Sequence, residues 1–310
     1  MSGNNPPTSG APQVVATRAE LKEALAAAPP RRAVVMTMGG LHSGHGELMS
    51  LGRELVGPDG HLVATIFVNP LQFAANEDLA KYPRTFEDDV ALCGQKSVDL
   101  VFAPTPDVMY PNGDLQVTID PGDLGLAYEG VARPTHFRGV LTVVMKFLEL
   151  TRPTFAVFGE KDYQQLTLIR QMVRDLDLPV QIVAGPTVRE ESGLAMSTRN
   201  KYLSPVARET ALRIPSAIAA GQSVAERGSS AVIEVVRSIL EAPAPEPVDV
   251  QYVAVTDPLM GPAPDSGEGR LIVTAIVDGT RLLDNAQVAL GPPGSFAAEA
   301  DSAAGVETGE

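Results

Sequence analysis

The sequence has little of several features that mark particular protein classes. Its 310 residues include one cysteine, Cys93, which excludes a disulfide framework and is expected to be a small core residue. No apolar run approaches the roughly 20 residues that span a bilayer, and the first residues lack the basic-then-apolar pattern of a signal peptide. The dipeptide Gly-Lys is absent, which excludes a Walker-type phosphate loop. We therefore expect a soluble, cytoplasmic protein.

Positive charge is also scarce. The chain has 24 Lys and Arg against 38 Asp and Glu, a formal net charge of −14. Nucleic acids and anionic membranes are bound by Lys and Arg that neutralise phosphates, so neither is an expected partner. A small anionic substrate would need a local basic pocket in this negative field, which draws attention to Lys161, Arg133 and Arg199.

Apolar runs alternate with helical patterns between residues 14 and 187. The expected strands are 33–38, 62–68, 100–103, 155–158 and 180–184. The expected helices are 45–56, 86–96, 138–151 and 163–177, the first burying Leu48, Leu51, Gly52 and Leu55. This alternation predicts an α/β domain with a Rossmann-like, doubly wound parallel sheet.

A smaller α+β domain is predicted for residues 188–290. Ser204-Pro205 is a helix start, 229–241 is a second helix, and three strand patterns follow with Asp278-Gly279 as a hairpin turn. The tails at 1–13 and 291–310 are rich in Pro and Gly or in Ala and acidic residues, so we expect both to be disordered.

The segment after the first strand holds two of the four histidines. Gly39 and Gly40 suit a tight turn, and His42 and His45 fall on the first turn of the next helix. Residues three apart face the same way, toward the strand end where open α/β sheets bind ligands and a helix N-terminus offers N–H groups to phosphate. The alternatives are two surface polar residues or a pair whose hydrogen bonds are satisfied within the protein, but the strand–turn–helix setting favours catalysis. Zinc is disfavoured because Cys93 is remote.

Two further strand ends carry polar groups. Asn69 and Gln72 follow the next strand, and their amides suit hydroxyl and carboxylate groups, although Asn69 could equally bond its own turn. Gly159 and Lys161 lie at a later strand-to-helix junction, where a lysine is a point charge for phosphate. Asp162 could accept from a ribose hydroxyl, but a helix cap is favoured.

Three other groups leave alternatives open. Asp88 and Asp89 begin a helix, where acids complement the helix dipole or, with substrate phosphate, hold Mg²⁺. Residues 197–199 form either a polar hinge or a mobile clamp for phosphates. Arg133 and His136 offer a cation and an imidazole before a helix, or belong to a structural loop.

In order along the chain, these segments resemble the pantothenate synthetase (pantoate–β-alanine ligase) family. The shared motifs, between about residues 14 and 290, are Thr37-Met-Gly-Gly-Leu-His-Ser-Gly-His45, Phe67-Val-Asn-Pro-Leu-Gln-Phe73, Tyr82-Pro-Arg84, Arg133-Pro-Thr-His-Phe-x-Gly-Val140, Gly159-Glu-Lys-Asp-Tyr-Gln-Gln-Leu166, Met196-Ser-Thr-Arg-Asn200 and Leu282-Leu-Asp-Asn285. The family belongs to a nucleotidylyltransferase superfamily whose His-x-Gly-His signature binds ATP. The resemblance implies a homodimeric enzyme that forms pantoyl adenylate from ATP and pantoate and then lets β-alanine displace AMP.

The resemblance also implies residue roles. ATP would be bound by Met38, Gly39, Gly40, Leu41, His42, Ser43, Gly44, His45, Gly159, Glu160, Lys161, Asp162, Val188, Met196, Ser197, Thr198 and Arg199. The catalytic residues among them would be His45, His42, Lys161 and Arg199. Pantoate would be held by Gln72 and Gln165, within a substrate site that includes Asn69, Arg133 and His136. Mg²⁺ would be held by Asp88 and Asp89.

Four positions depart from the family pattern: Met36 replaces a usual Pro, Ser43 a common acid, Thr198 a usual Ser, and Leu92 a Gln found in some members. Thr198 keeps a hydroxyl, whereas Leu92 weakens the metal assignment. The alternatives are another adenylyl-transferring enzyme of the superfamily and a catalytically silent nucleotide-binding protein. A class I tRNA synthetase is disfavoured by the acidic composition.

Overall fold

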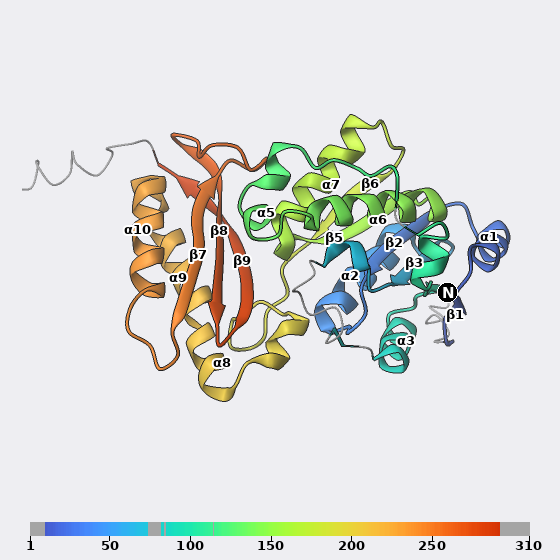
Figure 1. Cartoon of the computed structure of the whole chain (residues 1–310), viewed down its shortest axis with the longest axis horizontal. Helices are drawn as coiled ribbons and strands as arrows, with labels where there is room; N and C mark the ends of the chain where they lie inside the picture. The colour runs from blue at the N-terminus through green and yellow to red at the C-terminus, as the bar shows by residue number, and fades with distance from the viewer. Residues whose placement is uncertain (1–9, 74–81, 84, 114, 292–310) are drawn as a thin grey trace, which may run out of the picture. The chain divides into compact units, whose positions relative to one another are not determined.

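A computed structural model describes residues 10–73, 82–83, 85–113 and 115–291 (Figure 1). Arg84, the last residue of one shared motif, lies outside these ranges. The chain divides into two compact units, residues 1–188 and 189–310. The division falls one residue from the predicted domain boundary. Within the described ranges, no helix is long and apolar enough to cross a membrane.

The first unit contains a six-stranded parallel sheet, which confirms the predicted fold class. Its strands are β1 (Gln13–Val15), β2 (Arg32–Thr37), β3 (His61–Ile66), β4 (Leu100–Phe102), β5 (Phe155–Gly159) and β6 (Gln181–Gly185). Their spatial order is β1-β4-β3-β2-β5-β6. The chain passes from β2 toward one edge of the sheet and later returns to β5 on the other side of β2. The carboxyl ends of β2 and β5 therefore flank the switch point at which such sheets bind ligands.

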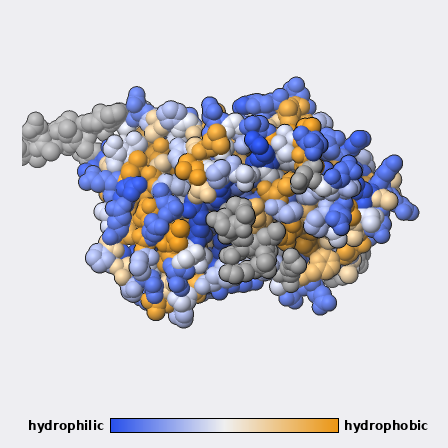
Figure 2. Space-filling view, viewed as in Figure 1, coloured by the Kyte–Doolittle hydropathy of each residue, from blue (hydrophilic) through white to orange (hydrophobic). Residues whose placement is uncertain are grey.

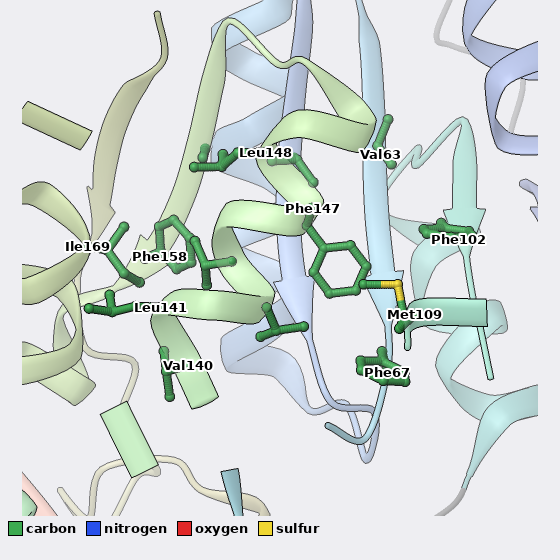
Figure 3. Close-up of a cluster of buried hydrophobic side chains, with 14 of the residues drawn as sticks. Val63, Phe67, Phe102, Met109, Val140, Leu141, Phe147, Leu148, Phe158 and Ile169 are labelled. Carbon is green, nitrogen blue, oxygen red and sulfur yellow. The ribbon is translucent and has the colours of Figure 1, made fainter. Parts of the chain in front are cut away.

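Helices cover both faces of this sheet, because its central strands are apolar on both sides. On β2, Val34 belongs to one apolar cluster and Val35 to another. The first cluster includes side chains of α6 (His136–Thr151) and α7 (Tyr163–Asp175), with Phe147 and Phe158 in its middle (Figure 3). The second includes side chains of α2 (Ser43–Val56) and α3 (Phe86–Gln95), and it contains Cys93, the expected core residue. The remaining helical elements are α1 (Arg18–Ala27), η1 (Pro70–Gln72), α4 (Pro106–Met109), η3 (Asp123–Leu126), α5 (Glu129–Ala132) and η4 (Glu160–Asp162).

The predicted N-terminal tail, residues 1–13, is too long. Gln13, placed in the disordered tail, begins β1 and donates its N–H to Asp99 O at 2.9 Å. A strand of three residues is too short to show a periodic pattern, and only its pairing with β4 defines it. Residues 1–9 lie outside the described ranges.

Helix α2 begins two residues before the expected position. The side of the helix that is most deeply buried is not the one that carries Leu48, Leu51 and Leu55. The fully buried positions are Gly46, Met49, Gly52 and Val56, whereas Leu48, Leu51 and Leu55 are partly buried against the same cluster. A Cβ at Gly52 would lie 2.8 Å from Leu62 Cδ1, so this helix packs on its glycines and displaces the leucines to the sides.

The second unit has an antiparallel sheet in the order β7-β8-β9, formed by Val248–Thr256, Gly267–Val277 and Thr280–Leu290. Asp278 and Gly279 both have positive φ in the predicted hairpin turn. The helical elements are η5 (Thr198–Tyr202), α8 (Pro205–Ala211), α9 (Arg213–Ser223), η6 (Ala225–Arg227) and α10 (Ser229–Leu240). Ser204 caps α8 as predicted. Gly291, placed in the disordered tail, donates its N–H to Ala225 O, so the prediction is wrong for this residue. The rest of the predicted tail, residues 292–310, lies outside the described ranges.

On the visible face, clusters of apolar residues lie between hydrophilic ones (Figure 2). In the first unit, large exposed apolar side chains include Val117, Leu126 and Val131, which are 82%, 59% and 72% exposed. They belong to one stretch of chain between α4 and α6.

Substitution of Gly139 on α6 tests how closely η1 packs against this helix. A Cβ there would lie 2.1 Å from Leu71 O in η1, although Ala is otherwise favoured over Gly in a helix by about 1 kcal/mol. We expect Gly139→Ala to lower the free energy of unfolding by about 1–3 kcal/mol through overpacking, measured by urea denaturation. Gly94→Ala on α3, where the nearest atom would be Pro12 Cδ at 3.4 Å, is the control and should cause no loss. Equal stabilities of the two variants would contradict this account of the packing.

Candidate active site

The turn after β2 is held by side chains from the end of β2 and from α3. Gly39 and Gly40 have φ of +83° and +63°, which glycine adopts most easily. Thr37 Oγ1 donates to Thr65 O at 2.7 Å and accepts from Gly39 N–H at 3.3 Å. Asp89 on α3 accepts from Gly40 N–H at 3.0 Å and from Leu41 N–H at 2.8 Å. The backbone that leads into α2 is therefore fixed by polar contacts.

His42 and His45 cap α2 reciprocally. His42 is the N-cap residue, and its Nδ1 accepts from Gly44 N–H at 3.2 Å. His45 is the third helical residue, and its Nδ1 accepts from His42 N–H at 3.3 Å, where a capping box usually has Glu or Gln. The ring centroids are 4.1 Å apart. Because Nδ1 of each ring accepts, each neutral ring carries its proton on Nε2.

This arrangement changes the expected phosphate donors. The sequence suggested unpaired N–H groups at the start of α2, but the imidazoles already cap those of His42 and Gly44. The side-chain donors of this turn are instead the two imidazole Nε2–H groups. Ser43, next to them, is exposed.

The end of β5 brings positive charge to His45. Burial lowers the pKa of His45 to about 3, helped by His42 and Lys161, while Asp162 acts in the opposite direction. Lys161 lies in η4, and its Nζ is 3.4 Å from Asp162 Oδ1. The structure thus brings His42, His45 and Lys161 together at the switch point, with His45 neutral. Asp162 occupies the N-cap position of α7 without a side-chain capping bond, so the favoured cap interpretation is wrong.

The side-chain amide of Asn69 is used in hydrogen bonds within the protein. Its Oδ1 accepts from Tyr110 Oη at 2.7 Å and from Leu71 N–H at 3.3 Å, and its Nδ2 donates to Gly139 O at 3.2 Å. The side chain is buried. Of the two interpretations, the turn-stabilising one describes this residue.

Arg133 and His136 hold the backbone of Gln72. Arg133 Nη2 lies 3.2 Å and His136 Nδ1 3.1 Å from the Gln72 carbonyl oxygen, and Arg133 Nη1 lies 3.1 Å from His136 Nε2. Gln72 is 8% exposed, and its side-chain amide makes no hydrogen bond with any residue in the described part of the chain. This amide is therefore available to a ligand.

The two adjacent glutamines of α7 have different environments. Gln164 accepts from Glu129 N–H at 3.1 Å and donates to Leu124 O and Ala127 O at 2.7 and 2.9 Å. Gln165 is partly buried and makes no such bond within the ranges that the structure covers. The available amide is the one expected to bind pantoate.

The expected magnesium ligands do not form a metal site by themselves. Asp88 is exposed on α3, while Asp89 is buried and occupied by the glycine turn. Among the described residues, no three His, Cys, Asp or Glu side chains are grouped as metal ligands would be. The residues present do not fit a dedicated Mg²⁺ site made by protein groups alone.

The remaining expected nucleotide contacts lie at the end of the first unit and in the second. Val188 is the last residue of the first unit and is partly buried. Ser197 Oγ accepts from Arg199 N–H at 3.2 Å at the start of η5. Met196 is partly buried and Thr198 is 9% exposed.

An ion-pair network, missed from the sequence, anchors this segment within the second unit. Glu190 accepts from Asn200 Nδ2 at 2.8 Å and from Arg208 Nη1 at 2.6 Å. Arg189 forms a bidentate pair with Asp284 at 2.6 and 2.9 Å. By contrast, the Arg199 guanidinium makes no hydrogen bond to the residues that the structure describes, which leaves it available to an anion.

The chain matches the sequence profile of the family described as pantoate-beta-alanine ligase over residues 13–287. The chain belongs to this family. This confirms the resemblance and the assignment to a ligase.

Named relatives agree over nearly the whole chain. A pantothenate synthetase from a Nocardioides species is 50% identical over 296 residues, covering 92% of this chain and 88% of the relative. The crystal structure of pantothenate synthetase from Thermus thermophilus has a TM-score of 0.81 at 43% identity, covering 88% of this chain and 98% of that one. A Francisella tularensis pantoate-beta-alanine ligase, complexed with "Beta-gamma ATP and Beta-alanine", has a TM-score of 0.73 at 29% identity, covering 89% and 97%.

The protonation of His45 can be measured directly. We expect its ring to stay neutral at pH 5, with the proton on Nε2, because its pKa is near 3 rather than 6.5. The unfolded chain then binds more protons between these values, so the stability that neutral His45 contributes is complete above pH 6.5 and falls toward pH 3. Histidine ¹⁵N NMR, with His45→Gln to assign the signal among four histidines, gives the midpoint. A midpoint near 6.5 would contradict this environment.

Proposed function

We propose that this chain condenses pantoate with β-alanine at the expense of ATP, through a pantoyl-adenylate intermediate. The observation that carries the proposal is the switch-point cluster, in which a neutral His45 and the Lys161 ammonium lie at the ends of β2 and β5. A neutral donor and a fixed positive charge suit a triphosphate, whose negative charge shifts during the reaction. The Francisella relative, described as complexed with "Beta-gamma ATP and Beta-alanine", supports the substrate pair.

In the first step, the pantoate carboxylate attacks the α-phosphorus and pyrophosphate leaves. No protein nucleophile is needed, so catalysis consists of alignment and stabilisation of charge on the phosphoryl oxygens. His42 and His45 supply Nε2–H donors and Lys161 supplies charge. The amides of Gln72 and Gln165 hold pantoate, and Arg133 and His136 fix the backbone of Gln72.

In the second step, the neutral amine of β-alanine attacks the acyl carbon of the adenylate and AMP leaves with the bonding electron pair. The attacking nitrogen loses a proton as the amide forms. Water must be excluded because the mixed anhydride hydrolyses. We assign phosphate binding to residues 196–199, whose Arg199 guanidinium would neutralise phosphate.

We infer that Mg²⁺ accompanies ATP and is held mainly by its phosphate oxygens, where it would neutralise charge on the leaving pyrophosphate. The described ranges contain no three-ligand cluster that would hold the ion independently of ATP. We also place the enzyme in the cytoplasm as a homodimer. The exposed side chains of Val117, Leu126 and Val131, which belong to one stretch of the chain, are candidates for a contact between subunits.

A substrate-omission assay tests the reaction. ATP and pantoate without β-alanine should give pyrophosphate in an amount close to that of the enzyme, and AMP should be released only when β-alanine is added. Measuring the two products separately distinguishes this enzyme from other adenylyl-transferring enzymes and from a silent nucleotide-binding protein. AMP release that requires β-alanine but not pantoate would refute the proposal.

The catalytic role of His45 can be separated from its role in capping α2. We expect His45→Ala to lose adenylate formation by about two to three orders of magnitude, the usual effect of removing a preorganised donor. His45→Gln restores the residue that a capping box prefers, so it should keep near-normal stability while exchange of pyrophosphate into ATP remains strongly reduced. Near-normal exchange in either variant would remove His45 from the mechanism.

A further inference from the structure

We propose that Asp89 is a positioning residue that fixes the glycine turn, residues 39–41, and that it does not ligate the metal that accompanies ATP. The proposal rests on the proposed function only in taking this turn as part of the ATP site. It differs from the role that resemblance implies for Asp89, and it is argued from the contacts of this chain.

The Asp89 carboxylate accepts three hydrogen bonds inside the protein, which occupy three of its roughly four acceptor positions. Oδ2 accepts from Gly40 N–H at 3.0 Å, and Oδ1 accepts from Leu41 N–H at 2.8 Å and from Thr85 Oγ1 at 3.0 Å. The residue is 2% exposed. A carboxylate that turned to a metal would leave two amides and a hydroxyl without their acceptor in a buried place. Each loss would cost more than an ordinary hydrogen bond contributes, because the acceptor is charged.

The turn is shaped to meet this carboxylate. A Cβ on Gly39 would lie 3.0 Å from Asp89 Oδ2, so the backbone passes as close to the oxygen as a glycine allows. The positive φ of Gly39 and Gly40 directs successive N–H groups toward α3. One carboxylate that accepts hydrogen bonds from two adjacent backbone amides fixes the conformation of that backbone. We call this arrangement the clamp.

Thr85 belongs to the same clamp. It is the N-cap residue of α3, and its hydroxyl, which makes no capping bond, donates to Asp89 one turn away. Its carbonyl oxygen in turn accepts from Asp89 N–H at 2.8 Å. Both the side chain and the backbone of Thr85 therefore hold Asp89 in place.

The rest of this face of α3 is unsuited to a metal. Leu92 has an apolar side chain and approaches α2, since a Cβ on Gly46 would lie 3.6 Å from Leu92 Cδ1. Asp88, the neighbouring acid, is exposed. The clamp fixes the turn from which His42 and His45 follow, so Asp89 acts on ATP through the backbone and not by contact with it.

Amide hydrogen exchange in protein free of nucleotide and metal tests the clamp. In Asp89→Asn, one amide donor of the new side chain must face a backbone donor, so exchange of Gly40 and Leu41 should accelerate by about 10- to 100-fold. Glu87→Gln is the matched control: it removes one negative charge from an exposed position on the same helix turn, and exchange at the glycine turn should not change.

The metal requirement supplies the second measurement. The Mg²⁺ concentration that gives half-maximal pyrophosphate exchange should be the same in Asp89→Asn as in the unmodified enzyme, while the KM for ATP rises. Unchanged amide exchange would overturn the proposal, and so would a rise of about tenfold or more in the half-maximal Mg²⁺ concentration. If the unmodified chain shows no pyrophosphate exchange at all, the proposed function fails, and the amide measurement still decides the clamp.

Thr85 provides a milder pair of variants in case Asp89→Asn does not fold. Thr85→Val removes the hydroxyl that Asp89 accepts from, and Thr85→Ser keeps it. We expect faster exchange of Gly40 and Leu41 in Thr85→Val and protection close to the original in Thr85→Ser. Equal exchange in the two variants would overturn the proposal.

Discussion

The site depends on one constraint, which is that β2 and β5 are neighbours at the centre of the sheet. From β2 the chain adds strands on one side, and it later returns to add β5 and β6 on the other side. The loops that leave these two strands open on the same edge of the sheet. One loop carries His42 and His45, and the other carries Lys161. The proximity of two imidazoles and an ammonium that are far apart in sequence follows from strand order.

Polar side chains around this edge fall into two groups with different consequences. Asn69, Gln164 and Asp89 are buried, and their hydrogen-bonding groups are used by neighbouring backbone and side chains. They set the positions of loops and are expected to act on a substrate only through those loops. The amides of Gln72 and Gln165 make no such bonds to the described residues, so binding a ligand costs them no internal partner.

The capping of α2 connects stability with chemistry. Each imidazole uses Nδ1 to satisfy a backbone N–H and thereby keeps its proton on Nε2. Burial lowers the pKa of His45 and so keeps its ring neutral. The same contacts that begin the helix therefore select the tautomer that donates to the ligand.

The sequence by itself determined the parallel α/β fold, the smaller antiparallel sheet and the position of the main motifs. Apolar periodicity and turn residues are local properties, and they located β2, α2 and the hairpin at Asp278 within one or two residues. Collinear motifs also identified the family, because the order of those motifs along the chain can be read without coordinates.

Only the tertiary structure decided which polar residues are available and which are occupied. Gln164 and Gln165 are neighbours of identical chemistry, and Asp88 and Asp89 are another such pair, yet one member of each pair is committed to backbone and the other is not. Hydrogen-bond partners of Asp89 come from residues more than 40 positions away, at Gly40 and Leu41. No local pattern encodes a partner at that distance, because it is the packing of α3 beside the turn that brings the two segments together.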